Sequence, residues 1–279
     1  MIVARTLAAL RDARRDARGP VGLVPTMGYL HQGHLSLVHA AKAECESVYA
    51  SIFVNPTQFG PHEDFAKYPR DEARDLEMLE SAGVSLVFIP SVEEMYPAGD
   101  ATRISVDALT GVLEGARRPG HFVGVATVVA KLLNAVQPDR SYFGQKDAQQ
   151  LAVIRRMVRD LLLPIEVVGC PIIRDDDGLA CSSRNVYLAP EQRQAALSLS
   201  RGLRAAEHAF AAGLRDAEAL RTIVRTQILA EPLAAIDYVS LADADSLAEL
   251  EGSVQGPALL SLVVGFGPTH LLDNVTLVP

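Results

Sequence analysis

Short apolar runs alternate with amphipathic stretches through about the first 172 residues, and this alternation constrains the fold more than any other feature of the chain. Val21–Val24 and Val48–Val54 are typical of the apolar runs, and Asp71–Ala82 is typical of the amphipathic stretches. Neighbouring parallel strands need a long crossover, usually a helix, whereas antiparallel strands need only a turn. We therefore expect an α/β fold with a Rossmann-like parallel sheet.

The same periodicity gives the bounds of the predicted elements. Strands are predicted at 21–24, 48–54, 84–89, 141–144 and 165–170, and helices at 6–18, after Gly28 through Ala41, 71–82, 122–136 and 148–161. The helix at 122–136 is apolar enough to be buried.

The pattern changes after Pro171. A turn at 175–178 precedes predicted helices at 190–212 and 216–229 and strands at 236–241, 259–266 and 275–278. We expect an N-terminal domain over residues 1–172 and a smaller α+β C-terminal domain over 173–279.

Charge and composition exclude several classes of protein. Lys and Arg number 26 against 34 Asp and Glu, a net charge of −8, so the chain has no positive excess for a nucleic-acid backbone. No stretch approaches the roughly 18 apolar residues of a membrane span, and no export signal follows the five arginines of the first 19 residues. The three cysteines are widely separated and lack zinc or disulfide spacing. We expect a cytoplasmic protein without a membrane segment.

The segment Pro25–His34 is the first with chemistry, because it lies where a strand gives way to a helix. A helix N-terminus offers N–H groups to anions, and Gly28 and Gly33 allow the backbone to come close to a phosphate. His31 and His34 are three residues apart, so they share a face of the helical turn. The alternative is a pair of surface histidines at a helix start.

Asn55 and Gln58 follow the second predicted strand. Their uncharged amides can donate to the carboxylate or hydroxyl of a hydroxy acid without burying a net charge. Asn55-Pro56-Thr57 as an ordinary turn is the competing interpretation.

Lys146 follows Gly144 at another strand-to-helix junction, which suits a cation that faces phosphate oxygens. A surface lysine is the alternative. Gln149 and Gln150 come next on the helix, about 100° apart, so we expect only one to face a pocket.

Ser182-Ser183-Arg184 supplies two hydroxyls and a guanidinium that could fold over a triphosphate. A serine N-cap is the competing interpretation, and one loop can serve both purposes.

These segments resemble the pantothenate synthetases (pantoate–β-alanine ligases) of the HIGH-motif nucleotidyltransferases. The matching blocks are PTMGYLHQGHLSLV at 25–38, FVNPTQF at 53–59 with Glu63-Asp64 and Tyr68-Pro69-Arg70, GQKDAQQ at 144–150, and DGLACSSRN at 177–185. Four blocks in order make the resemblance specific, although the C-terminal hundred residues resemble the family only in length and element order.

The resemblance implies ATP-dependent condensation of pantoate with β-alanine through a pantoyl adenylate, with release of AMP and pyrophosphate. It implies Mg²⁺ held through the ATP phosphates, without assigned protein ligands, and a homodimer whose C-terminal domain serves as a lid or in dimerisation. The implied ATP site comprises Met27, Gly28, His31, His34, Gly144, Lys146, Asp147, Ile173, Cys181, Ser182, Ser183 and Arg184. His31, His34, Lys146 and Arg184 are the implied catalytic residues, and Asn55, Gln58 and Gln150 the implied pantoate and β-alanine ligands.

Three positions depart from the family pattern. Cys181 stands where we expect Met or another apolar residue, Gln145 replaces a common Glu, and Ala148 replaces a frequent Tyr. Cys181 is expected to fill its place as a small hydrophobic residue.

Two other functions remain open at this point. One is a related nucleotidyltransferase or a fragment of an aminoacyl-tRNA synthetase, which the acidic balance disfavours. The other is a regulator that binds ATP without chemistry, which would not need Asn55, Gln58 or Gln150. Pyrophosphate–ATP exchange that depends on pantoate would separate these from a pantoate ligase.

Overall fold

The computed structural model describes residues 1–60, 65, 66 and 68–279, and its chain divides into two compact units. The first unit comprises Met1–Gln145 and Gln149–Pro171, and the second comprises Lys146–Ala148 and Ile172–Pro279. Glu63 and Asp64, which belong to the second motif block, lie outside the described residues.

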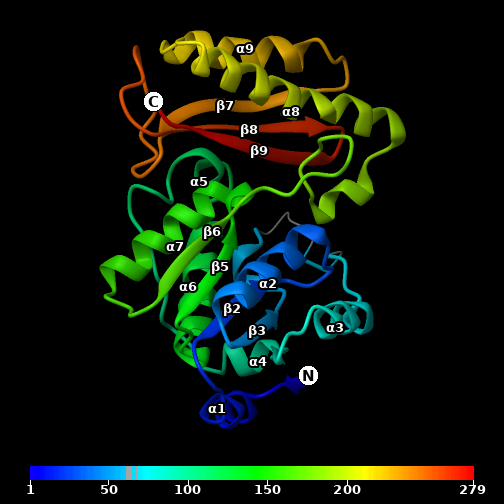
Figure 1. Cartoon of the computed structure of the whole chain (residues 1–279), viewed down its shortest axis with the longest axis vertical. Coiled ribbons are helices and arrows are strands. Elements are labelled where there is room, and N and C mark those ends of the chain that lie inside the picture. The colour runs from blue at the N-terminus through cyan, green and yellow to red at the C-terminus, as the bar shows by residue number, and fades with distance from the viewer. Residues whose placement is uncertain (61–64, 67) are drawn as a thin grey trace. The chain divides into compact units, whose positions relative to one another are not determined.

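The first unit is built on a six-stranded sheet of order β1-β4-β3-β2-β5-β6 (Figure 1). All of its strand pairings are parallel, so the predicted Rossmann-like sheet is confirmed. Its elements, with the turn that leads into α7, are β1 (Ile2–Ala4), α1 (Leu7–Arg15), β2 (Val21–Thr26), α2 (Gln32–Glu44), β3 (Ser47–Ile52), η1 (Pro56–Gln58), α3 (Glu72–Ser81), β4 (Leu86–Phe88), α4 (Val92–Met95), α5 (Leu113–Arg117), α6 (His121–Val136), β5 (Arg140–Gly144), η2 (Gln145–Asp147), α7 (Ala148–Asp160) and β6 (Glu166–Cys170).

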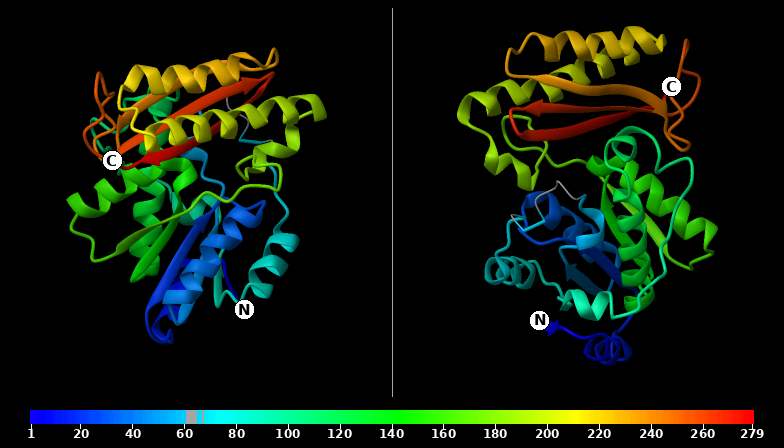
Figure 2. Two further views of the ribbon diagram at one scale, coloured as in Figure 1. Left: turned by 45° about the horizontal axis from the view of Figure 1, so that its top comes forward. Right: turned by 180° about the vertical axis from the view of Figure 1, so that it is seen from behind.

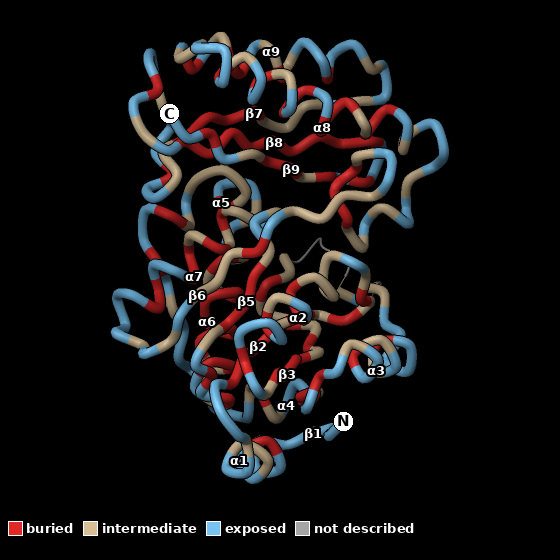
Figure 3. The backbone as a smooth tube through the Cα atoms, viewed as in Figure 1, coloured by how far each residue is buried: buried red, intermediate tan, exposed pale blue. Residues whose placement is uncertain are grey.

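Helices lie on both faces of this sheet (Figure 2). Ala50 of β3 belongs to the core that α2 and α3 complete, whereas the hydroxyl of its neighbour Tyr49 donates to Ala13 O of α1. Because consecutive strand residues point to opposite faces, α1 lies on the face opposite α2, and α6 packs beside α1. Most residues of the inner strands β2, β3, β4 and β5 and of α6 are buried (Figure 3), which confirms the predicted buried helix.

The second unit has a three-stranded antiparallel sheet of order β7-β8-β9, with α8 and α9 on one face (Figures 1 and 2). Its elements are η3 (Ser183–Tyr187), α8 (Pro190–Ala211), α9 (Ala217–Leu229), β7 (Ala235–Asp243), β8 (Ala258–Phe266) and β9 (Thr269–Leu277). The apolar residues of both helices and of β8 form one core. This arrangement confirms the predicted α+β C-terminal part.

Two strands differ from the prediction. β1 is absent from the predicted elements, because three residues are too few to show a periodicity. β9 begins at Thr269 rather than Val275, because the polar residues Asp273 and Asn274 interrupt the apolar pattern although both are buried. None of the helices in the described part of the chain is both long and apolar enough to cross a bilayer.

Candidate functional site

The order of the strands reverses between β2 and β5. From β2 the chain continues to β3 and β4 on one side, whereas β5 and β6 lie on the other. Ligands of open parallel sheets bind outside the carboxyl ends of the strands at such a reversal. The loops that follow β2, β3 and β5 carry three of the four motif blocks, so the fold brings together segments that are distant in the sequence.

The loop after β2 has an unusual backbone. Gly28 has a φ of 82° and Tyr29 a φ of 52°, a left-handed conformation that non-glycine residues seldom adopt. Thr26 fixes the start of this loop. The Thr26 hydroxyl donates to Ser51 O over 2.7 Å and accepts from Gly28 N over 3.2 Å. The loop is thereby fixed to β3 before it reaches the histidines.

His31 and His34 are held by the backbone of the α2 N-terminus. Nδ1 of His31 accepts from Gly33 N over 3.1 Å, and Nδ1 of His34 accepts from His31 N over 3.3 Å. A neutral imidazole that accepts at Nδ1 carries its hydrogen on Nε2. The ring centroids are 4.1 Å apart, and each ring carries its hydrogen on Nε2.

The N–H group of Gly33, at the start of α2, donates to the His31 ring. A phosphate that accepts from this amide would have to replace that hydrogen bond. The expectation that this turn faces a phosphate stays a prediction.

Asn55 and Gln58 form one amide pair at η1. Nδ2 of Asn55 donates to Oε1 of Gln58 over 3.0 Å and to Gly124 O over 3.1 Å, and its Oδ1 accepts from Thr57 and from the hydroxyl of Tyr96. Both amide hydrogens of Asn55 therefore have protein acceptors. In this structure Asn55 thus orients Gln58, and its expected contact with a substrate stays a prediction.

The orientation of Gln58 leaves its amide nitrogen, Nε2, as the atom that can donate to a ligand. Oε1 is taken by Asn55, and Nε2 lies 3.2 Å from Sδ of Met27, a weak acceptor. Because the side chain is buried, a ligand that accepts from Nε2 would replace a poor hydrogen bond by a good one.

His121 supports the same turn from α6, and sequence reasoning left it outside the site. Its Nδ1 donates to Gln58 O over 2.8 Å, and its Nε2 accepts from Nη1 of Arg118 over 3.1 Å. A carbonyl only accepts and a guanidinium only donates, so these partners fix the tautomer. In the sequence, the one feature that pointed to His121 was the basic segment 117–121, which also contains Pro and Gly.

Gln149 and Gln150 have separate environments at the start of α7. Gln149 is buried, donates to Leu109 O and Val112 O over 2.8 Å each, and accepts from Glu114 N. It fixes the segment before α6, whereas Gln150 is only half-buried. This leaves Gln150 as the amide that can face a ligand, the residue that the family resemblance selects.

Lys146 lies two residues beyond Gly144, the last residue of β5. Its ammonium group is 3.4 Å from Oδ1 of Asp147, and its side chain is 16% exposed. Its carbonyl accepts from Nδ2 of Asn274 on β9 over 2.7 Å. No motif or periodicity in the sequence pointed to Asn274, which lies 128 positions away.

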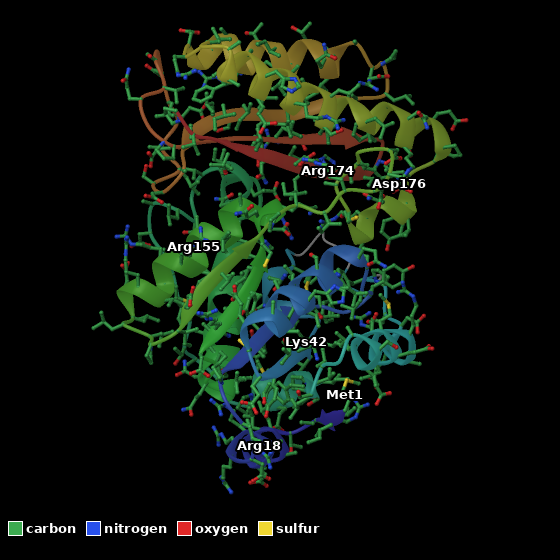
Figure 4. The ribbon with its side chains drawn as sticks, in the orientation of Figure 1. Met1, Arg18, Lys42, Arg155, Arg174 and Asp176 are labelled. Atoms are coloured by element: carbon green, nitrogen blue, oxygen red, sulfur yellow. The ribbon has the colours of Figure 1, made fainter. Side chains whose placement is uncertain are left out.

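The fourth block lies in the second unit, where a short hairpin precedes it. Arg174 and Ala180 form an antiparallel bridge, and Cys181 N donates to Ile173 O. The guanidinium of Arg174 binds Asp273 through two hydrogen bonds of 2.6 and 3.0 Å, and Figure 4 shows Arg174 beside β9. Ion pairing to a buried carboxylate fixes the hairpin that leads into Ser182.

Ser182 caps η3, because its hydroxyl accepts from Arg184 N over 3.2 Å. The capping interpretation is therefore correct for Ser182. Ser183 is half-buried and Arg184 is exposed, so both can still contact a ligand.

Cys181 is buried, as expected of a small hydrophobic residue. Its thiol also donates to Oδ1 of Asp175 over 3.1 Å. Burial and this carboxylate raise the pKa of Cys181 to about 12. Among the described residues there is no cluster of three His, Cys, Asp or Glu side chains suited to a metal ion.

The parallel sheet, its reversal point and the paired histidines define a Rossmann-like α/β nucleotide-binding protein. The family model described as "Pantoate-beta-alanine ligase" matches residues 2–276. The chain is 60% identical to the pantothenate synthetase of Chloroflexus aggregans over 274 residues, which cover 98% of this chain and 99% of that protein.

Solved structures agree. The pantothenate synthetase of Thermus thermophilus has 50% identity and a TM-score of 0.95, with full coverage of both chains. The pantoate–β-alanine ligase of Francisella tularensis, solved in complex with "Beta-gamma ATP" and β-alanine, has 33% identity and a TM-score of 0.80 and covers 99% of this chain and 97% of that one. The chain therefore belongs to the pantoate–β-alanine ligase family, whose activity is the ATP-dependent formation of pantothenate.

Proposed function

We propose that the chain makes pantothenate in two steps at the reversal point of its sheet, with a pantoyl adenylate as the intermediate. The observation that carries the proposal is the placement of His31 and His34 after β2 and of the oriented amide of Gln58 after the neighbouring parallel strand β3. Imidazole donors suit phosphate oxygens, and an amide suits a hydroxy acid.

In the first step a carboxylate oxygen of pantoate attacks the α-phosphorus of ATP. The bond to the bridging oxygen breaks, and pyrophosphate leaves with the negative charge. Catalysis of this step depends on donors and cations that receive the growing charge. In this proposal His31 and His34 of the first unit supply them, together with Lys146, Ser182, Ser183 and Arg184 of the second unit. Met27, Gly28, Gly144, Asp147, Ile173 and Cys181 complete the proposed ATP site.

Pantoate is held by amides. Gln58 and Gln150 donate to its carboxylate or hydroxyl groups, and Asn55 orients Gln58. Gln58 also contacts β-alanine in this proposal. This division gives each neighbouring amide of the FVNPTQF block a separate role.

In the second step the amine of β-alanine attacks the activated acyl carbon. The bond between that carbon and the phosphate oxygen breaks, AMP leaves, and the new amide nitrogen loses a proton. No covalent bond to the enzyme is needed, so the acceleration comes from holding the two reactants together.

Mg²⁺ fits this site as an ion carried by ATP. The side chains at the reversal point are mainly imidazoles, amides and an ammonium group, which favour phosphate oxygens over a hard cation. Mg²⁺ would therefore be held by the phosphates and water, with Asp147 as the carboxylate beside Lys146, and would neutralise charge on the leaving pyrophosphate.

Residues 1–172 are proposed as the nucleotide- and pantoate-binding domain, and 173–279 as a lid and dimerisation domain that hinges at 172–174. We propose a cytoplasmic homodimer. The three cysteines are unpaired thiols, which suits a reducing compartment.

Pyrophosphate–ATP exchange tests the mechanism directly. Exchange should require pantoate and proceed without β-alanine, because only the first step is reversed. Exchange without pantoate would indicate another nucleotidyltransferase, and binding of ATP without exchange would indicate a regulator; either result contradicts the proposal.

His34→Ala tests the site. It removes one phosphate donor and should lower the exchange rate by about 10²- to 10³-fold while the protein stays folded. His39→Ala is the matched control, because His39 is exposed on the same helix. Equal rates for the two variants would remove His34 from the site.

A further inference from the structure

The α3 helix carries one carboxylate that faces inward. The side chain of Asp75 is 1% exposed, although its neighbours Arg74 and Glu72 are exposed. Its Oδ2 accepts from Tyr29 N over 2.7 Å, and its Oδ1 accepts from Leu30 N over 2.8 Å. Two consecutive backbone amides of the loop after β2 thus donate hydrogen bonds to one buried carboxylate.

These two amides belong to the part of the loop whose backbone is least favourable by itself. Gly28 and Tyr29 are both left-handed, and a Cβ at Gly28 would lie only 3.0 Å from Oδ2 of Asp75 and from Cγ2 of Ile52. Strained backbone persists only where its surroundings enforce it. Asp75 is the charged group that does so here, and glycine at position 28 leaves it room.

The electrostatics fit a permanent structural contact. Burial raises the pKa of Asp75, and the hydrogen bonds from Leu30 and Tyr29 counteract that rise. Arg74 lies 4.0 Å from Oδ1 and over the ring of Tyr29, at 5.7 Å from its centroid, so it faces both the carboxylate and the loop. Each oxygen of Asp75 accepts a hydrogen bond from one N–H group of the loop, so the orientation of the carboxylate is fixed as well as its position.

We propose that Asp75 is a positioning residue for the nucleotide: its carboxylate holds residues 28–30 in the turn that places the His31 and His34 rings. Leu30 N, which donates to Asp75, immediately precedes the N-cap residue His31. A shift of Leu30 would therefore move both Nε2–H donors together. The inference rests on the proposed role of the two histidines at the ATP phosphates.

Asp75→Asn tests it, because one carboxylate oxygen becomes an NH₂ group that cannot accept from a backbone N–H. The expected result is a fall of about 10- to 100-fold in kcat/KM for ATP in pyrophosphate exchange, the size typical of a misplaced catalytic group. The KM for pantoate should change less than about twofold, because Gln58 is held by Asn55. A general loss of folding would instead affect all substrates alike.

Asp71→Asn is the matched control. It makes the same chemical change four positions earlier, at the exposed N-cap of α3, where Asp71 accepts from Arg74 N. Asparagine caps helices about as well as aspartate, so this variant should keep the helix and leave kcat/KM for ATP within about twofold of the parent. Equal defects in the two variants, or wild-type kinetics in Asp75→Asn, would overturn the proposal.

A second measurement needs no variant. In the unmodified protein, hydrogen exchange at Tyr29 N and Leu30 N should be as slow as in the interior of α2, because both amides end on a buried acceptor. Fast exchange at either amide contradicts the inference.

His34→Ala in the same assay separates the two hypotheses. If His34→Ala loses exchange and Asp75→Asn does not, the positioning role is wrong and the site stands. If His34→Ala retains exchange, the assignment of the histidines themselves is wrong.

Discussion

Asn55 and Gln58 lie three positions apart, carry the same functional group and have different roles. The amide of Asn55 is satisfied by Gln58, Gly124, Thr57 and Tyr96, whereas Gln58 keeps a nitrogen whose partner is a thioether. Residue type alone predicts that both side chains can donate and accept hydrogen bonds. Which of them can bind the substrate depends on which of their atoms already have hydrogen-bond partners in the protein.

Cys181 gives a second case at this scale. It lies in the DGLACSSRN block, next to the serines of the proposed ATP loop, where a reactive thiol would be open to oxidation. Burial and the carboxylate of Asp175 instead raise its pKa to about 12, so the thiolate, which is the reactive form, is scarce at neutral pH.

We therefore predict slow alkylation of Cys181 by iodoacetamide in the native protein. At pH 8, four units below its pKa, the thiolate fraction is on the order of 10⁻⁴, and it rises only as the pH approaches 12. Peptide mass mapping over time measures the rate, with the denatured chain as the reference for an ordinary thiol. Equal rates in the native and denatured chains would contradict the assignment.

The contact between α6 and η1 matters most at the scale of elements, because it places Gln58. A Cβ at Gly124 would lie 2.4 Å from Thr57 O and 2.7 Å from Cα of Gln58, so only glycine allows the helix to come this close. Gly124 O also accepts from Asn55, and His121 binds Gln58 O from the start of the same helix. The buried helix α6 is thus also the support of the proposed pantoate amide.

Gly124→Ala should therefore push η1 away from α6. We expect a KM for pantoate raised by about tenfold and a free energy of unfolding lowered by about 1–3 kcal/mol, the range for overpacking a core. Steady-state kinetics and denaturant unfolding measure the two effects. Gly111→Ala is the control, because a Cβ there meets nothing within 4 Å. An unchanged KM in Gly124→Ala would mean that η1 does not set pantoate affinity.

At the scale of the whole molecule, the net charge does not describe the charge of a single site. The chain carries −8, and the proposed ATP site would draw on His31, His34, Lys146 and Arg184 from separate parts of the sequence. A local group of donors can bind a polyanion that the overall charge would repel, because salt screens interactions beyond about 8–10 Å. Net charge thus argues against a nucleic-acid polymer and not against ATP.

The homodimer is the prediction that belongs to this scale. It follows from the family resemblance and not from surface apolarity, because single exposed leucines such as Leu162 and Leu229 are normal on a monomer. Sedimentation equilibrium at micromolar concentration should give twice the chain mass of 29.9 kDa. A mass of one chain under these conditions would contradict the proposal.

The local pattern of the sequence determined the parallel sheet, the buried helix α6 and the histidine pair, because periodicity, turn residues and motif spacing act over a few positions. It did not determine β9, whose buried Asp273 needs Arg174, 99 positions away. The sequence pattern also did not show that Asp75 accepts from Leu30 N, 45 positions earlier. Nor did it show that the Asn55 amide donates to both Gln58 and Gly124 O. Such partners meet only when the strands and helices pack, because a buried polar atom is satisfied by whatever neighbour the fold supplies. The residue types of the site were thus readable in the sequence, and the assignment of their individual atoms was decided by tertiary structure.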